Sequence, residues 1–271
     1  MLTLNEIRDA QKSIASDIRR TDLLLATKMS GENQIYLKTE NLQVTGSFKA
    51  RGAANKINQL TEEERSRGII ACSAGNHAQG VARAAQKKGI RCTICMPFGA
   101  PLSKVEATKS YGADIVLVKD TYDDAYAKAV EIQKETGATF VHPFNDEAVI
   151  AGQGTIGLEI LEQLPDVDAV ITSIGGGGLL SGTALAIKSL KPDCKVYGVQ
   201  AANAPAMHHS YKEHHIVTTA SADTFADGIA VKEPGSLTYN LINRYVDDIA
   251  LVSEDEIATA ILMLLEKEKV V

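Results

Sequence analysis

The feature that most constrains the fold is a regular alternation of short apolar segments with amphipathic segments between residues 61 and 144. Strand-like segments are IIAC (69–72), RCTICM (91–96), DIVLV (114–118) and ATFVHPF (138–144). The first helical segment begins with a capping box of Thr61 and Glu64, and later ones end at Gly89, Gly112 and Gly137. Strands joined by helices in this way predict a parallel sheet with right-handed crossovers.

A second α/β stretch follows. It is predicted to contain a helix over 147–164, strand DAVITSI (168–174), helix LLSGTALAIKSL (179–190), and strands KVYGVQ (195–200) and IALV (249–252). Ser253 and Glu256 form a capping box for a terminal helix. The two stretches predict an α/β protein of two domains, with a ligand cleft between them at the carboxyl ends of the strands.

Composition narrows the classes of function. The chain has 271 residues with a formal net charge of −6, and only 5% of its residues are aromatic. A nucleic-acid interface needs a basic surface and stacking rings, so we expect no nucleic-acid partner. The N-terminal segment lacks the apolar core of a secretory signal, and no segment is long enough for a membrane span. We therefore expect a soluble cytoplasmic protein that binds no membrane.

Two groups of residues raise the question of a metal or redox site. Cys92 and Cys95 form a C-x-x-C, but a strand places side chains three residues apart on opposite faces, so buried structural thiols are favoured. The segment HHSYKEHH (208–215) could bring His208 and His215 to one face of a helix, although no acidic residue completes a ligand set. A solvated polar helix is favoured there, and no metal site is expected.

Lys49 stands out in the segment ENLQVTGSFKARGA (40–53), because Ser47 can cap a helix that begins beside it. An amine at a helix N-terminus lies in a positive potential, and burial disfavours its charge further. Both effects lower the pKa of the amine and make it a better nucleophile. A solvated lysine without a chemical role is the alternative.

Four consecutive glycines, from Gly175 to Gly178, lie between a predicted strand and a predicted helix. Without side chains, the backbone N–H groups of such a loop can converge on an anion at the helix N-terminus, and phosphate is the natural guest. The Lys-Ser/Thr pair of a nucleoside-triphosphate loop is absent from the run. A flexible turn without a ligand is the alternative.

The loop Ser73–His77 (SAGNH) also joins a strand to a helix, and its N–H groups, hydroxyl and amide suit a substrate carboxylate. Simple N-capping of the helix by Asn76 is the alternative. The segment Gly152–Gly157 satisfies G-x-G-x-x-G, but no convincing strand precedes it and no suitable acidic residue follows, so a dinucleotide site is disfavoured.

Taken together, these segments resemble the fold-type II pyridoxal-phosphate enzymes, and most closely the threonine dehydratases (threonine ammonia-lyases). The matching pieces are TGSFKARGA (45–53), SAGNHAQG (73–80), AGQGT (151–155), GGGGL (175–179) and ADGIAV (226–231). They occur in the family's order across nearly the whole chain. The resemblance implies two parallel-sheet three-layer α/β domains, similar to the tryptophan synthase β-subunit, with the active site in the cleft between them. It also implies a large domain of residues 1–52 and 147–271 and a small domain of residues 53–146.

The resemblance further implies a role for each matching residue. Lys49 holds pyridoxal 5′-phosphate as a Schiff base and acts as the base at the substrate Cα. Phe48 packs beside the cofactor ring, Asn76 binds its 3′ oxygen, and Gly228 lies near it. The phosphate is cradled by Gly175, Gly176, Gly177, Gly178 and Leu179. The substrate carboxylate is surrounded by Ser73, Ala74, Asn76 and His77.

The implied reaction eliminates water from a small hydroxy amino acid, and the unsaturated product then tautomerises and is hydrolysed to a 2-oxo acid and ammonia. Threonine gives 2-oxobutanoate and serine gives pyruvate. Serine racemase is the nearest alternative, but racemases of this type carry a proton-donating serine where this chain has Ala74. They also bind a divalent cation through acidic residues at positions that match Gln200 and Ala206 here. Both differences favour a dehydratase. A protein that binds a phosphorylated ligand without turnover is the other alternative.

The resemblance also bears on assembly and length. Such enzymes are usually homodimers or homotetramers. The family continues beyond the terminal helix with a segment that includes a Ser or Cys facing the pyridine nitrogen, whereas this sequence ends at Val271. We therefore expect the natural gene product to be longer.

Overall fold

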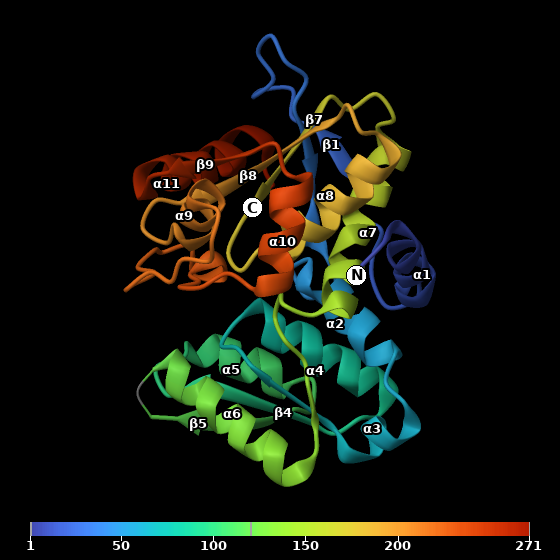
Figure 1. The fold of residues 1–271 in the computed structure, drawn as a ribbon, viewed down its shortest axis with the longest axis vertical. Coiled ribbons are helices and arrows are strands. Elements are labelled where there is room, and N and C mark those ends of the chain that lie inside the picture. The colour runs from blue at the N-terminus through green and yellow to red at the C-terminus, as the bar shows by residue number, and fades with distance from the viewer. Residues whose placement is uncertain (1, 120, 271) are drawn as a thin grey trace.

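The computed structural model describes residues 2–119 and 121–270, and these form two α/β lobes, one above the other in Figure 1. The lower lobe contains a four-stranded parallel sheet in the order β5-β4-β3-β6. Its strands are β3 (Ile69–Cys72), β4 (Cys92–Pro97), β5 (Asp114–Val118) and β6 (Thr139–Phe140). Its helices are α3 (Glu62–Arg67), α4 (Asn76–Lys88), α5 (Leu102–Lys109) and α6 (Tyr122–Thr136).

The predicted helix signals act as expected in this lobe. Thr61 and Glu64 make the reciprocal capping box of α3. Gly89 and Gly137 end α4 and α6 in the left-handed conformation, where a side chain would be strained. The predicted strand 138–144 is shorter than expected: after Phe140, the N–H of Val141 still bonds the Ile70 carbonyl of the neighbouring strand β3, and the chain then leaves the sheet.

The upper lobe is built on a three-stranded parallel sheet in the order β7-β8-β9. Its strands are β7 (Ala169–Ser173), β8 (Lys195–Ala201) and β9 (Asp248–Val252). The helices around it are α1 (Leu4–Ile14), α7 (Glu147–Gln163), α8 (Gly178–Leu190), α9 (Ala206–Glu213), α10 (Ser236–Tyr245) and α11 (Glu254–Met263). Short single turns are η1 (Glu40–Leu42), η2 (Asp227–Ile229) and η3 (Leu264–Glu268). The predicted parallel sheets are confirmed in both lobes.

Helix α2 (Lys49–Asn58) lies where the two lobes meet, and it packs on α7 of the upper lobe and on α4 of the lower one. Its inward residues Ala53, Ala54 and Ile57 belong to the lower-lobe core, which Val149 of α7 also enters. Because one buried cluster takes residues from both sides, α2 and α7 are held against the lower lobe by apolar packing.

The G-x-G-x-x-G segment lies in the middle of α7 and therefore does not form the strand-to-helix loop that a dinucleotide site needs. A Cβ at Gly152 would come within 2.6 Å of the Arg51 carbonyl oxygen, and one at Gly154 within 2.9 Å of the Gly182 carbonyl oxygen. These glycines let α7 approach α2 and α8 closely, which is a packing role.

The antiparallel hairpin of β1 (Leu23–Leu25) and β2 (Tyr36–Lys38) was not predicted, and neither were α1 and α10. The strands are three residues each, and no two-residue turn motif joins them. Leu24 and Leu25 are exposed, so the apolar pattern that usually reveals a half-buried strand is missing.

The structure agrees with the prediction for the cysteines but not with the shared helical face considered for the histidines. Cys92 and Cys95 are buried in separate core clusters on opposite faces of β4, as predicted. Helix α9 ends at Glu213, so the idea that His208 and His215 share a helical face is wrong. Among the described residues, no cluster of three or more His, Cys, Asp or Glu could hold a metal ion. The helices described within 2–119 and 121–270 include none long and apolar enough to cross a membrane.

Candidate active site

Lys49 is the first residue of α2, at the junction of the lobes. The predicted cap is shifted: Phe48 precedes the helix, and the Ser47 hydroxyl accepts only the Lys49 N–H, at 3.3 Å. The Lys49 amine donates a hydrogen bond to the Pro143 carbonyl oxygen at 2.8 Å, and it lies 5.5 Å from the centroid of the Phe48 ring. Burial lowers the pKa of Lys49 to about 8, so a useful fraction of the amine is neutral near neutral pH.

Residues 141–145 carry the chain from β6 to α7 and touch each part of the candidate site. The Val141 carbonyl accepts a hydrogen bond from Nε2 of His77, at 2.8 Å, and the Pro143 carbonyl accepts the one from the Lys49 amine. The Phe144 ring lies so close to Gly176 that a Cβ there would come within 2.4 Å of it. Sequence reasoning took 138–144 as a strand and missed this segment, although its proline was a signal that the strand could not continue.

The glycine run joins β7 to α8, with Gly178 and Leu179 as the first two residues of the helix. Gly177 has φ +94°, which only glycine adopts easily, and a Cβ at Gly175 would come within 2.9 Å of the Ile229 Cα. Within residues 2–119 and 121–270, the backbone N–H groups of Gly175–Gly178 donate no hydrogen bond. Four free donors at a helix N-terminus make a site suited to an anion such as phosphate.

The loop 73–77 joins β3 to α4. The Ser73 hydroxyl accepts the Gly75 N–H at 3.2 Å, while in the described part of the chain the N–H groups of Ala74, Asn76 and His77 donate to no partner. Gly75 rather than Asn76 precedes the helix, so the alternative that Asn76 caps it is wrong. Asn76 is exposed and is the first residue of α4.

His77 is buried at the start of α4 and is electrically neutral. Burial, together with the nearby charge of Lys49, lowers the pKa of His77 to about 3. Its Nε2 donates to the Val141 carbonyl, so its Nδ1 is an acceptor, and this atom is buried without a partner among the residues that the structure describes. The ring therefore fixes the loop to residue 141 and leaves its backbone N–H for a ligand.

Gly228 lies in η2, which borders the glycine run through the contact of Ile229 with Gly175. Its neighbour Asp227 forms an ion pair with Lys104 of α5, so η2 also reaches the lower lobe. The structure thus brings Gly228 beside the glycine run. The positions at which racemases bind a divalent cation lie elsewhere, at Gln200 on β8 and Ala206 on α9.

At those positions, Gln200 and Ala206 offer no carboxylate. Gln200 is fully buried, and its Oε1 accepts the N–H of His208 at 2.8 Å. Ala206 is the first residue of α9 and is also buried.

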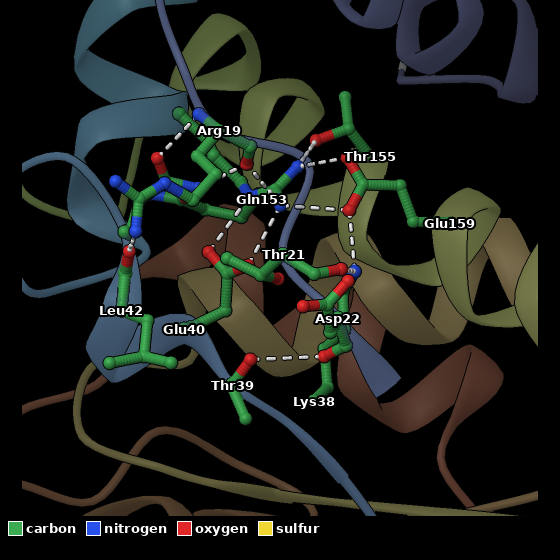
Figure 2. A network of polar contacts seen from close by, with 12 residues as sticks. Arg19, Thr21, Asp22, Lys38, Thr39, Glu40, Leu42, Gln153, Thr155 and Glu159 are labelled. Carbon is green, nitrogen blue, oxygen red and sulfur yellow. Dashed lines mark hydrogen bonds and ion pairs between the residues drawn. The ribbon is translucent and has the colours of Figure 1, made fainter. Parts of the chain in front are cut away.

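A buried ion network lies around Arg51, two residues after Lys49 in α2, and Figure 2 shows three of its members, Lys38, Glu40 and Glu159. Arg51 is fully buried and bonds both oxygens of Glu40 and both oxygens of Glu159, at 2.7–2.9 Å. Lys38 completes the network with a 2.6 Å bond to Glu159. Burial alone would lower the pKa of Arg51 and raise that of Glu159, but their mutual hydrogen bonds prevail and shift both pKa values the other way.

A family model described as pyridoxal-phosphate dependent enzyme matches residues 14–271. The chain belongs to the pyridoxal-phosphate dependent enzymes. Among relatives of this enzyme, the L-threonine ammonia-lyase of Thermotoga maritima is 55% identical, over 100% of this chain and 68% of the relative. The L-threonine dehydratase catabolic TdcB of Escherichia coli K12 is 47% identical, over 100% of this chain and 83% of the relative.

Solved structures confirm the predicted fold class of this pyridoxal-phosphate dependent enzyme. Maize serine racemase superimposes with a TM-score of 0.97 at 38% identity, over 99% of this chain and 82% of that one. The processed form of threonine deaminase isoform 2 from Solanum lycopersicum gives a TM-score of 0.94 at 39% identity, over 97% of this chain and 73% of that one. The fold is therefore shared by dehydratases and racemases, and the choice between them depends on particular residues.

Proposed function

We propose that this enzyme eliminates water from L-threonine and from L-serine, and that hydrolysis of the unsaturated product then releases ammonia and gives 2-oxobutanoate or pyruvate, respectively. The two relatives cited above at 47% and 55% identity carry the names L-threonine dehydratase and L-threonine ammonia-lyase. The observation that carries the proposal is the setting of Lys49. The residue is half-buried, the pKa of its amine is lowered to about 8, and the amine is hydrogen-bonded to segment 141–145, which contacts the glycine run.

The residues present fit pyridoxal phosphate. We propose that Lys49 binds its aldehyde carbon, that Gly175–Gly178 and Leu179 hold its phosphate through backbone N–H groups, and that Phe48, Asn76 and Gly228 surround its ring. The free N–H donors of the glycine run supply the cradle, and a side chain at Gly176 would collide with Phe144. When bound, pyridoxal phosphate supplies a conjugated ring that takes up the electron pair left on the substrate Cα.

The protein residues then orient the substrate and move its proton. The free N–H groups of loop 73–77 and the Ser73 hydroxyl bind the carboxylate, while His77 keeps this loop fixed to residue 141. The neutral amine of Lys49 removes the proton from Cα, which is the step for which a base with a pKa near the working pH is best suited. The β-hydroxyl then takes up a proton and leaves as water, and a water molecule hydrolyses the released unsaturated amino acid to the 2-oxo acid and ammonia.

Serine racemase is the second candidate, favoured by the superposition on the maize enzyme. A racemase needs a second proton donor on the opposite face of Cα. Racemases of this type carry a serine that supplies this proton. The matching residue in this chain is Ala74, whose methyl group has no proton to donate. The dehydratase is therefore the stronger proposal.

Several broader features belong to the same proposal. We propose a large cofactor-binding domain of residues 1–52 and 147–271 and a small domain of residues 53–146, an assembly of two or four copies, and a cytoplasmic location. The catabolic names of the relatives from Escherichia coli and Staphylococcus aureus favour threonine catabolism over isoleucine biosynthesis.

The test of the cofactor role is spectroscopic. Purified protein mixed with pyridoxal phosphate should develop the visible absorption band of a protonated Schiff base, and Lys49→Ala should abolish it. Lys12→Ala is the matched control, because Lys12 is an exposed lysine of α1. A wild-type protein that stays colourless, or a Lys49→Ala variant that keeps the band, would contradict the proposal.

A further inference from the structure

The turn at residues 142–145 is closed by a histidine side chain. Nδ1 of His142 accepts hydrogen bonds from the backbone N–H groups of Phe144, at 3.2 Å, and Asn145, at 2.8 Å. Two N–H donors cannot face a protonated nitrogen, so Nδ1 carries no proton and the ring is the neutral tautomer with hydrogen on Nε2. Burial lowers the pKa of His142 to about 4, with the charge of Lys49 acting in the same direction and that of Asp146 opposing it.

This turn determines where two groups of the site lie. Pro143 lies between His142 and the two residues whose N–H groups bond the histidine ring. Its φ is fixed and it has no N–H of its own, so the direction of its carbonyl is determined by the shape of the turn. That carbonyl accepts the Lys49 amine at 2.8 Å. Phe144, the next residue, packs its ring on the glycine run and meets the His142 ring edge-on, with centroids 4.7 Å apart.

The far side of the turn is anchored independently. Oδ1 of Asn145 accepts the N–H of Leu237 at the start of α10, at 2.9 Å. Oδ1 of Asp146 accepts the N–H of Val149 in the first turn of α7. The near side is held by Val141, whose N–H bonds the Ile70 carbonyl of β3 and whose carbonyl accepts His77 Nε2. With both sides held, the direction of the Pro143 carbonyl depends on the bonds that His142 makes inside the turn.

From this geometry we infer that His142 is a positioning residue for Lys49: its Nδ1 shapes the turn so that the Pro143 carbonyl holds the free lysine amine. The inference rests on the proposed function, in which Lys49 must be a free amine whenever it acts as a base. One N–H of the amine is directed to the carbonyl, and the long side chain is thereby restrained while its lone pair stays available for the Cα proton. After proton transfer, the C–H electron pair remains with the substrate and cofactor, and the new ammonium keeps the same acceptor.

The consequence is a specific kinetic effect. A lysine side chain has several rotatable bonds, so an amine without its acceptor spends less time in the reactive arrangement. Substrate binding does not use this contact. Loss of the turn should therefore lower kcat and leave KM nearly unchanged, and it should slow the reaction of the free amine with pyridoxal phosphate.

Three substitutions separate the acceptor from the bulk of the ring. His142→Asn places an amide oxygen near the position of Nδ1, and Asn closes such turns through the same i to i+2 bond. His142→Gln keeps an amide of similar polarity but places its oxygen near the position of Nε2. His142→Leu keeps the bulk without any acceptor. His215→Leu and His215→Gln are matched controls at an exposed histidine.

The experiment measures the rate at which the visible band forms when cofactor-free protein meets pyridoxal phosphate, and kcat and KM for L-threonine. We expect His142→Leu and His142→Gln to slow both rates by roughly ten- to a hundredfold with KM within about twofold, whereas His142→Asn stays within about threefold of wild type. Circular dichroism and the melting temperature check that each variant is folded, and the Asn–Gln pair decides the question if the leucine variant is not.

Two results would overturn the inference while the proposed function stands. One is that all three variants match wild type; the other is that His142→Asn is impaired as much as His142→Gln, which would assign the effect to the ring itself. If wild type forms the band but gives no 2-oxo acid, the band-formation rates alone decide. If wild type forms no band, the proposed function fails and the inference fails with it.

Discussion

Replacing Arg51 with methionine should strongly destabilise the protein, because it leaves the buried carboxylate of Glu159 and the mostly buried carboxylate of Glu40 without their shared cation. The wild-type network has two cations, Lys38 and Arg51, and two carboxylates, Glu40 and Glu159, so its charges balance. Glu159 is 5% exposed and Arg51 is 0% exposed, so solvent cannot replace the lost bonds. Breaking a buried ion pair from one side costs about 3–5 kcal/mol, a large fraction of a typical stability of about 5–15 kcal/mol.

The expected loss can be expressed as a shift in melting temperature. With an unfolding entropy of about 2.1 cal/mol/K per residue, the loss corresponds to a fall of roughly 5–9 °C for this chain of 271 residues. The double variant Arg51→Met with Glu159→Gln removes a carboxylate together with the cation. It should be more stable than the single variant, since fewer uncompensated charges stay buried.

The pH dependence checks the electrostatic reasoning. In wild type, burial acts to raise the pKa of Glu159, but hydrogen bonds from Arg51 and Lys38 outweigh it and the pKa is lowered. The stability that Glu159 contributes is therefore fully present above the pKa of the unfolded state, and it is lost as the pH falls through the pKa of the folded state. In Arg51→Met, burial should raise the pKa of the same carboxyl. The stability difference, measured by denaturant unfolding, should therefore shrink from pH 7 toward pH 4. A difference below about 1 kcal/mol at pH 7, or one that grows in acid, would refute this account.

Three further predictions concern the site. Gly176→Ala should abolish most pyridoxal-phosphate binding, measured by the visible band, because its Cβ would meet the Phe144 ring at 2.4 Å. Gly75→Ala is the control and should bind the cofactor normally, because the space around Gly75 is open. Equal binding by both variants would count against the glycine cradle. The rate of reaction of cofactor-free protein with pyridoxal phosphate should rise with pH up to about 8 and fall about tenfold per unit below that, as the Lys49 amine becomes protonated; a flat profile would contradict its lowered pKa. Ala74→Ser should add a proton donor and give measurable D-serine from L-serine by chiral chromatography; no D-serine at any enzyme concentration would remove Ala74 as the discriminating residue.

Much of the fold could be predicted because its signals are local. Capping boxes such as Thr61–Glu64 and terminal glycines such as Gly89 determine helix ends within a few residues, and the structure confirms them. The parallel sheets follow from the order of strands and helices. The hairpin of Leu23–Leu25 with Tyr36–Lys38 could not be predicted in this way, since its strands are short and partly exposed and the long loop between them carries no hairpin turn motif.

The candidate site was predicted where a loop carries its own pattern and missed where it depends on distant partners. Lys49 and the glycine run stand out in the sequence, and the structure links them through residues 141–145. Pro143 has no side-chain chemistry to notice; only its carbonyl is used. Arg51 and Glu159 are 108 residues apart and look like ordinary surface charges until the fold buries them together.

The central claim is that this chain eliminates water from threonine by means of Lys49. The most direct test incubates the protein, loaded with pyridoxal phosphate, with L-threonine, L-serine and D-serine, and quantifies 2-oxo acid, ammonia and the serine enantiomers. The account predicts 2-oxobutanoate and ammonia in equal amounts from L-threonine, pyruvate from L-serine, and no product from Lys49→Ala. Interconversion of the serine enantiomers without any 2-oxo acid would contradict it.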